Sequence, residues 1–158
     1  MKLPPHEQML SAITYDPLTG LFTKPGKPAS RGNSDIRGYL CVSVLNQNYR
    51  AHRLAWYCMT GSWPVGEIDH INGVKVDNRW INLRLCNHQQ NNHNQGMRRT
   101  NSSGIKGVYW NKSQRKWRGQ VCLNYKVHHT KGFEQIGEAA AAVRVLRDEL
   151  HGEFANHG

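Results

Sequence analysis

The sequence predicts an α+β protein built from two small modules of mixed helices and strands. Short runs rich in β-branched and aromatic residues alternate with polar turns in both halves of the 158-residue chain. At residues 138–150, apolar residues recur at gaps of four, three and four, which predicts a helix with one apolar face. Residues 96–103 are small, basic and polar, as is typical of a linker. We therefore expect one domain at 1–95 and a second at 104–158.

The first half is expected to consist of short helices and strands separated by turns. Pro4 and Pro5 suit the first turn of a helix. The run GYLCVSVL has the composition of a strand, and the polar NQN after it turns the chain back. The expected helices are 3–13, 52–59 and 87–95; the expected strands are 38–45, 68–73 (ending in a turn) and 81–86.

The second half is expected to form three strands followed by the helix at 138–150. A polar turn joins strands at 107–110 and 117–123, and a third strand covers 126–131. Because side chains alternate along a strand, the apolar and polar residues of 117–123 fall on opposite faces. The helix stripe, formed by Ala139, Val143, Leu146 and Leu150, is expected to pack as a core face.

The charge balance indicates a polyanionic partner. The net charge is +10 and the isoelectric point about 9.8, with +4 in residues 1–95 and +6 in residues 96–158. Nucleic acid is the first candidate and a membrane surface the second, while a solvated basic surface remains the alternative. No apolar run approaches the roughly 20 residues of a membrane span, and no signal-peptide core is found. A soluble, cytoplasmic protein is expected.

The segment 69–94 carries the residues that suggest chemistry, namely an Asp-His pair followed by many asparagines. Hydrolysis of a phosphodiester needs a base to activate water, a metal to stabilise charge, and a group that holds the base. Asp and Asn oxygens suit Mg²⁺ or Mn²⁺, and a neutral imidazole suits the base near pH 7. The four cysteines form no CxxC pair, so zinc is not expected.

The segments IDHING at 68–73, DNR at 77–79, NLR at 82–84 and NN at 91–92 together resemble the HNH nuclease motif, closest to its homing-endonuclease and phage branch. Steps of 12 from His70 to Asn82 and of 9 from Asn82 to Asn91 fit the family's spacing. The resemblance extends upstream, where YDPLTG, GY and AHRLAW are similar to the N-terminal part of phage HNH proteins. It implies two antiparallel strands and a helix around one metal ion.

The resemblance also implies roles for individual residues. Asp69 and Asn91 would ligate one Mg²⁺ or Mn²⁺, with Asn92 as the alternative to Asn91. His70 would be the general base, and Asn82 would brace the loop and orient His70. The implied activity is metal-dependent endonucleolytic cleavage of double-stranded DNA, as a nick or a double-strand cut, by a monomer or weak dimer. A phage-encoded protein would act in the host cytoplasm.

Several interpretations stay open at this point. Arg79 and Arg84 either hold phosphate or solubilise the loop. His52 is interpreted as a packed or capping residue, and His88 and His93 as part of a solvated helix face. The rival functions are a non-catalytic DNA-binding regulator that retains the nuclease fold, and a protein that binds or cuts RNA. Loss of the histidine or of a ligand would mark a regulator, and both are present.

Residues 104–158 resemble a second family, the ethylene-response-factor type of DNA-binding domain known from plants. The resemblance rests on the segments GVYW, KWR, KGF, EAA and GE. It implies a three-stranded antiparallel sheet packed on one helix, with the sheet in the major groove. Tyr109 stands where that family usually has Arg, so no base preference is predicted. The candidate DNA contacts are Trp110, Lys112, Arg115, Lys116, Trp117 and Arg118, of which Trp117 is also a candidate core residue.

Overall fold

The computed structural model describes residues 4–97 and 99–158, which form two compact units, Met1–Asn87 and His88–Gly158. Each unit mixes helices with small antiparallel sheets, so the α+β class is confirmed. The boundary lies ahead of the linker expected at 96–103, because helix α3 (His88–His93) contacts the segment Gly152–Phe154 of the C-terminal half. Arg98 of that expected linker lies outside the described residues.

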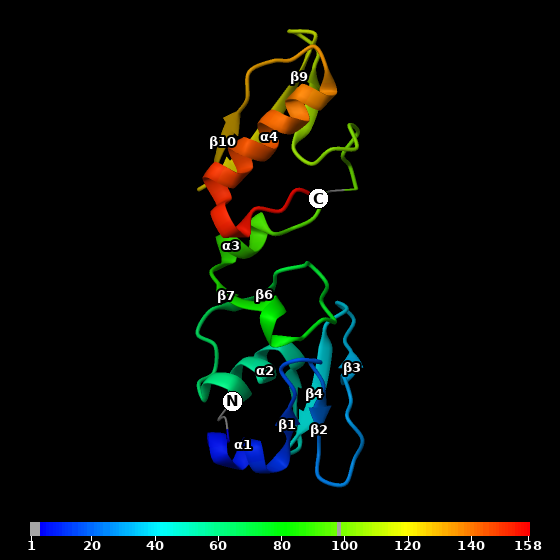
Figure 1. Ribbon diagram of the computed structural model, residues 1–158, viewed down its shortest axis with the longest axis vertical. Coiled ribbons are helices and arrows are strands. Elements are labelled where there is room, and N and C mark those ends of the chain that lie inside the picture. Colours follow the sequence, from blue (N-terminus) through cyan, green and yellow to red (C-terminus); the bar gives the residue numbers. More distant parts are fainter. Residues whose placement is uncertain (1–3, 98) are drawn as a thin grey trace. The chain divides into compact units, whose positions relative to one another are not determined.

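The first unit joins three small antiparallel sheets to two helices (Figure 1). Strand β4 is central in the sheet of order β3-β4-β5, while β1 pairs with β2 and β6 pairs with β7. The elements expected at 3–13, 38–45, 52–59, 68–73 and 81–86 are present with boundaries shifted by a few residues, and further short elements lie between them. They are α1 (His6–Ala12), β1 (Thr14–Tyr15), β2 (Phe22–Thr23), β3 (Asn33–Ser34), β4 (Leu40–Val44), β5 (Gln47–Arg50), α2 (Ala51–Thr60), β6 (Glu67–His70), η1 (Trp80–Asn82) and β7 (Leu83–Cys86).

One apolar core holds the first unit together and anchors the β6-β7 hairpin. Helix α2 buries Leu54 completely and ends at Gly61, whose φ of 72° is the left-handed conformation that glycine favours. Ile68 of β6 and Leu83 of β7 belong to the same core as Leu54. Because these two side chains are buried, the register of the hairpin is fixed; His70 shares their face, while Asp69 and Arg84 point to the opposite one.

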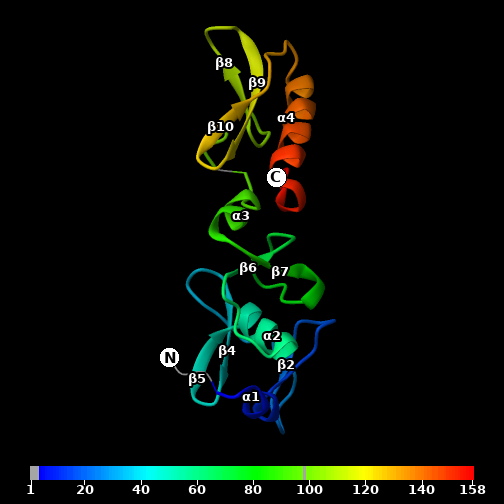
Figure 2. The same cartoon turned by 90° about the vertical axis from the view of Figure 1, so that its left-hand side faces the viewer.

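The second unit contains a three-stranded sheet covered on one face by a helix (Figure 2). Its further elements are β8 (Val108–Asn111), β9 (Lys116–Leu123), β10 (Lys126–His129), α4 (Ile136–His151) and η2 (Gly152–Phe154). The expected helix stripe is confirmed as a core face, since Ala139 and Val143 are buried against Val108 and Val121. At Gly119 a Cβ atom would lie 2.6 Å from the Cβ of Val143, so the helix approaches the sheet where no side chain intervenes.

Candidate active site

The Asp-His pair lies at the end of β6, with both side chains withdrawn from solvent. Asp69 is 5% exposed and His70 is 4% exposed. In the antiparallel register Asp69 stands opposite Arg84, whose Nε and Nη2 donate to Asp69 Oδ2 at 2.9 and 2.8 Å. This ion pair adds a third role for Arg84 to the two considered from the sequence. Its guanidinium compensates the charge of a buried carboxylate.

The His70 ring has a buried amide partner, Asn78. Nε2 of His70 lies 3.0 Å from Oδ1 of Asn78, a residue that is 2% exposed. With the amide oxygen facing the ring, Nε2 is the donor, and the neutral tautomer carries its lone pair on Nδ1. Burial lowers the pKa of His70, while the Asn78 hydrogen bond acts in the opposite direction. A neutral imidazole with a defined tautomer is what a general base requires.

Asn82 braces the loop that follows His70 and does so from both ends. Its Oδ1 accepts from the backbone N–H of Asn72 at 2.9 Å, and its Nδ2 donates to the carbonyl of Asp77 at 2.8 Å. Its own carbonyl accepts from the N–H of Ile71, also at 2.9 Å. The bracing role expected of Asn82 thus has a structural basis, whereas the amide on the His70 ring belongs to Asn78. Asn78 belongs to the DNR segment of the resemblance, which gave it no role of its own.

A turn near the N-terminus supports the backbone at Asn78. The Tyr15 hydroxyl donates to the carbonyl of Asn78 at 2.7 Å, and the N–H of Trp80 donates to the carbonyl of Pro17 at 2.9 Å. Burial raises the pKa of Tyr15, which keeps its hydroxyl protonated and donating. A Cβ at Gly20 would lie 2.7 Å from the backbone of Asn78. The YDPLTG segment therefore supports the backbone of Asn78, whose side chain is hydrogen-bonded to His70.

The rings of Tyr39 and His52 pack beside His70. The rings of His52 and His70 are 5.2 Å apart and edge to face, and the Tyr39 ring lies 5.2 Å from His52. His52 is 4% exposed, and burial lowers its pKa to about 3. It is thus a neutral, packed residue, in agreement with the interpretation from the sequence. The ammonium of Lys75 lies 4.8 Å from the Tyr39 ring centre, which brings a positive charge close to these rings.

Arg79 is paired within its own loop. Its Nε and Nη2 donate to the two carboxylate oxygens of Asp77 at 2.7 and 2.6 Å, and these bonds lower the pKa of Asp77 to about 2. Half of the Arg79 side chain is exposed, so the guanidinium can still reach a phosphate. The structure therefore leaves the phosphate role of Arg79 open, while giving it a second role in stabilising the loop.

The remaining expected ligand, Asn91, lies on α3 in the second unit. Asn91 is half-buried, and its neighbour Asn92 is exposed. Of the flanking histidines, His88 is exposed, whereas His93 stacks on His151 with ring centres 3.7 Å apart. The sequence had suggested that His93 belongs to a solvated helix face, but in the structure it is a packed residue. The choice of Asn91 over Asn92 remains a prediction.

The donor set fits a hard cation. Within the described ranges 4–97 and 99–158, no three His, Cys, Asp or Glu side chains are gathered as a metal cluster. The expected site would instead combine one buried carboxylate, Asp69, with amide oxygen. Such donors suit Mg²⁺ or Mn²⁺ better than softer ions. A cation at Asp69 would share the carboxylate with Arg84, so the ion pair and the metal are in competition.

In the second unit, the expected DNA contacts gather at one end of the sheet. Lys112, Arg115 and Lys116 lie in or next to the β8-β9 turn and are exposed. Trp110 is 43% exposed, whereas Trp117 packs partly against the core. The Arg118 guanidinium donates to the carbonyl of Thr130 at 3.0 and 3.1 Å, which holds it along the sheet. No helix of the described residues has the length and apolarity needed to cross a membrane.

Comparison with known proteins gives three matches. Residues 49–93, which include Asp69, His70, Asn82 and Asn91, match a family model described as HNH endonuclease. Protein 3.8 of Escherichia phage T7 is 36% identical over 107 residues, which is 67% of this chain and 88% of that protein. HNH endonuclease L560 of Acanthamoeba polyphaga mimivirus is 32% identical over 88 residues, 56% of this chain and 44% of that protein. No solved structure matches significantly.

Proposed function

We propose that this chain, which matches the HNH endonuclease family over residues 49–93, is a metal-dependent endonuclease that hydrolyses phosphodiester bonds of double-stranded DNA. The observation that best supports catalysis is the buried Asp69-His70 pair, in which Asn78 fixes the tautomer of His70. A DNA-binding regulator that merely kept the fold would have no need for an oriented, neutral imidazole beside a buried carboxylate. HNH endonucleases generally use a divalent metal ion.

Asp69 and Asn91 are the residues that would hold the metal ion. Their oxygens fit one Mg²⁺ or Mn²⁺, which would share the buried Asp69 carboxylate with Arg84. When bound, the ion stabilises negative charge on the phosphate and on the leaving oxygen. Arg84 would then be free to contact the same phosphate, since the metal takes over part of its role at Asp69.

The chain's own residues would carry the proton transfer. Nδ1 of His70 accepts a proton from a water molecule while Nε2 stays hydrogen-bonded to Asn78. The water oxygen forms the new bond to phosphorus as the bond from phosphorus to the 3′ oxygen breaks. Asn82 keeps the loop after His70 in place, so that the ring does not move when it becomes charged. A second water protonates the leaving oxygen.

The second unit would bind the duplex. Its 71 residues contain all 11 basic and 5 acidic residues that follow position 87, a balance of +6. The exposed Lys112, Arg115 and Lys116 would contact phosphates, together with Trp110 and Arg118. Phosphate contacts position a protein without reading sequence. We therefore expect salt-sensitive binding with little sequence preference from this unit.

Cleavage of supercoiled plasmid DNA tests the proposal. Wild-type protein is incubated with Mg²⁺, with Mn²⁺ or with EDTA, beside His70→Ala and the control His128→Ala, which removes a histidine of β10 outside the site. We expect metal-dependent conversion to open-circle or linear DNA. EDTA abolishes it, and His70→Ala lowers it at least about 100-fold, as expected for loss of a general base.

The same assay separates the alternatives. Accumulation of open circles before linear DNA indicates nicking, whereas direct formation of linear DNA indicates a double-strand cut. Wild-type protein that binds duplex DNA tightly but cuts no DNA with either metal would contradict the proposal and favour a regulator. Preferential cleavage of an RNA duplex of the same sequence would show that the substrate is RNA and not DNA.

A further inference from the structure

Helix α3, which carries Asn91, is too short and too polar to form on its own. It has six residues, His-Gln-Gln-Asn-Asn-His, and none of them is buried. Asparagine and histidine are poor helix formers, and isolated helices shorter than about 12 residues are marginal in water. The helical geometry of α3 must therefore come from groups outside it.

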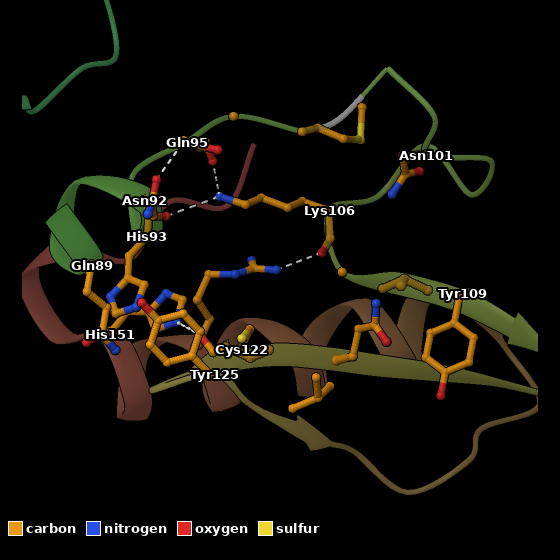
Figure 3. A pocket seen from close by; sticks show the side chains of 18 of the residues that line it. Gln89, Asn92, His93, Gln95, Asn101, Lys106, Tyr109, Cys122, Tyr125 and His151 are labelled. Atoms are coloured by element: carbon orange, nitrogen blue, oxygen red, sulfur yellow. Dashed lines mark hydrogen bonds between the residues drawn. The ribbon is translucent and has the colours of Figure 1, made fainter.

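Lys106 is the centre of the contacts that hold the end of α3. Its ammonium donates to the carbonyls of His93, Gln95 and Asn156, which belong to α3, to the chain after it and to the segment 152–158. Figure 3 shows the Lys106 side chain extending toward His93 and Gln95, where it lines a cavity of about 770 Å³. Burial lowers the pKa of Lys106 to about 8, so the site keeps this charge at a cost that its carbonyl partners offset.

The segment 152–158 and helix α4 complete the set of contacts. Nδ2 of Asn156 donates to the carbonyl and to Oδ1 of Asn94 at 2.8 and 3.0 Å, and Asn94 is 7% exposed. The His93 ring stacks on His151 of α4, and the His151 N–H donates to the carbonyl of Cys122 at 2.9 Å. Arg147, which is 3% exposed, donates to the carbonyl of Lys106 at 2.7 Å and so fixes the lysine itself.

We propose that Lys106 and Asn156 are positioning residues of the nuclease, which hold α3 so that Asn91 is presented as a metal ligand. The inference rests on the proposed function for the role of Asn91. Lys106 and Asn156 lie outside the segment 49–93 that matches the family model, and the proposal gives them a part in the reaction. The second unit would thus supply the geometry of a ligand-bearing helix in addition to a surface for DNA.

Two readouts test the proposal on the full chain. Hydrogen exchange of backbone amides reports whether residues 88–95 are held, and titration with Mn²⁺ alone reports the metal site. The variants are Lys106→Met, the conservative Lys106→Arg and the milder Asn156→Ala. The matched control Lys126→Met removes the same charge from an exposed position on β10.

We expect Lys106→Met to speed exchange in residues 88–95 at least about tenfold, while β8–β10 and α4 keep their protection. The Kd for Mn²⁺ rises about 10- to 100-fold, the range typical of lost support behind a metal ligand. Asn156→Ala shifts both readouts in the same direction, Lys106→Arg restores part of them, and Lys126→Met changes neither.

Two results would overturn the proposal. One is unchanged exchange in 88–95 and unchanged Mn²⁺ affinity in both Lys106→Met and Asn156→Ala. The other is faster exchange spread evenly over the whole second unit, which would make these residues general stabilisers. Wild-type protein that binds no Mn²⁺ refutes the proposed function and the role of Asn91, whereas the exchange data still decide whether Lys106 holds α3.

Discussion

Replacing Asn78 with alanine should lower the rate of DNA cleavage by a predictable amount. The change deletes the oxygen that lies 3.0 Å from Nε2 of His70 and leaves that buried N–H without its partner. An unsatisfied buried donor costs about 1–3 kcal/mol, and each 1.4 kcal/mol corresponds to a factor of ten. If the cost falls on the orientation of the base, the rate decreases about 5- to 150-fold.

The pH profile separates this effect from a general loss of structure. His70 must be neutral to act, so the rate rises with pH through its pKa, which burial places below the usual 6.5. The Asn78 hydrogen bond raises that pKa, so the acidic limb of the Asn78→Ala profile moves to lower pH. Asn78→Asp places a carboxylate on the ring and moves the limb to higher pH.

The measurement is the single-turnover rate of plasmid cleavage between pH 5 and 8 at saturating Mg²⁺, with unfolding curves for each variant. Asn78→Ala protein that is folded and cuts at the wild-type rate with the same acidic limb would refute the reasoning. A slower rate with an unmoved limb would leave Asn78 as a structural residue of the loop only.

Three further predictions concern stability. His52 stays neutral in the folded state down to a pH of about 3, whereas in the unfolded state it is protonated near pH 6.5. The free energy of unfolding therefore decreases as the pH is lowered from 6.5 to 3, by up to about 1.4 kcal/mol per pH unit. Urea unfolding of His52→Phe should lack this slope. Gly20→Ala should lower stability by about 1–3 kcal/mol, because its Cβ would meet the backbone of Asn78. Tyr125→Gly should raise the melting temperature slightly, since Tyr125 is fully exposed at a φ of 61°.

Each of these has a contradicting result. A pH-independent difference between wild type and His52→Phe would show that His52 is not held neutral. A Gly20→Ala protein as stable as wild type would show that the loop at Asn78 yields at little cost. A lower melting temperature for Tyr125→Gly would mean that the Tyr125 side chain contributes contacts that outweigh its backbone strain.

The longer elements of both units could be predicted because each has a local pattern. The stripe of α4 repeats at helical gaps, and the sheet of the second unit alternates apolar and polar residues along β9. The Asp69-His70 pair could be found because the order and spacing of its neighbours match a known motif. These signals depend on residues close together in the sequence, so they survive without knowledge of the fold.

The partners of the site could not be predicted because they come from distant segments. The amide of Asn78 reaches His70, while the hydroxyl of Tyr15 and the backbone at Gly20, both from the N-terminal segment, lie against the Asn78 backbone. Arg84 gave no sign of its ion pair until the β6-β7 register placed it opposite Asp69. The compact units divide at residues 87–88, ahead of the expected linker, because α3 is held by residues more than ten positions further on.

The pattern of support has a consequence for how such a nuclease tolerates sequence change. His70 is hydrogen-bonded to Asn78, and the turn that contains Gly20 packs against Asn78, so a substitution 50 residues before the proposed base would alter the proposed catalysis. The helix with Asn91 depends on Lys106 in the same way. A variant that keeps every motif residue but loses the support from the Gly20 turn or from Lys106 would still match the HNH motif in its sequence. The unfolding curve, the acidic limb and the Mn²⁺ affinity together would identify which support had failed.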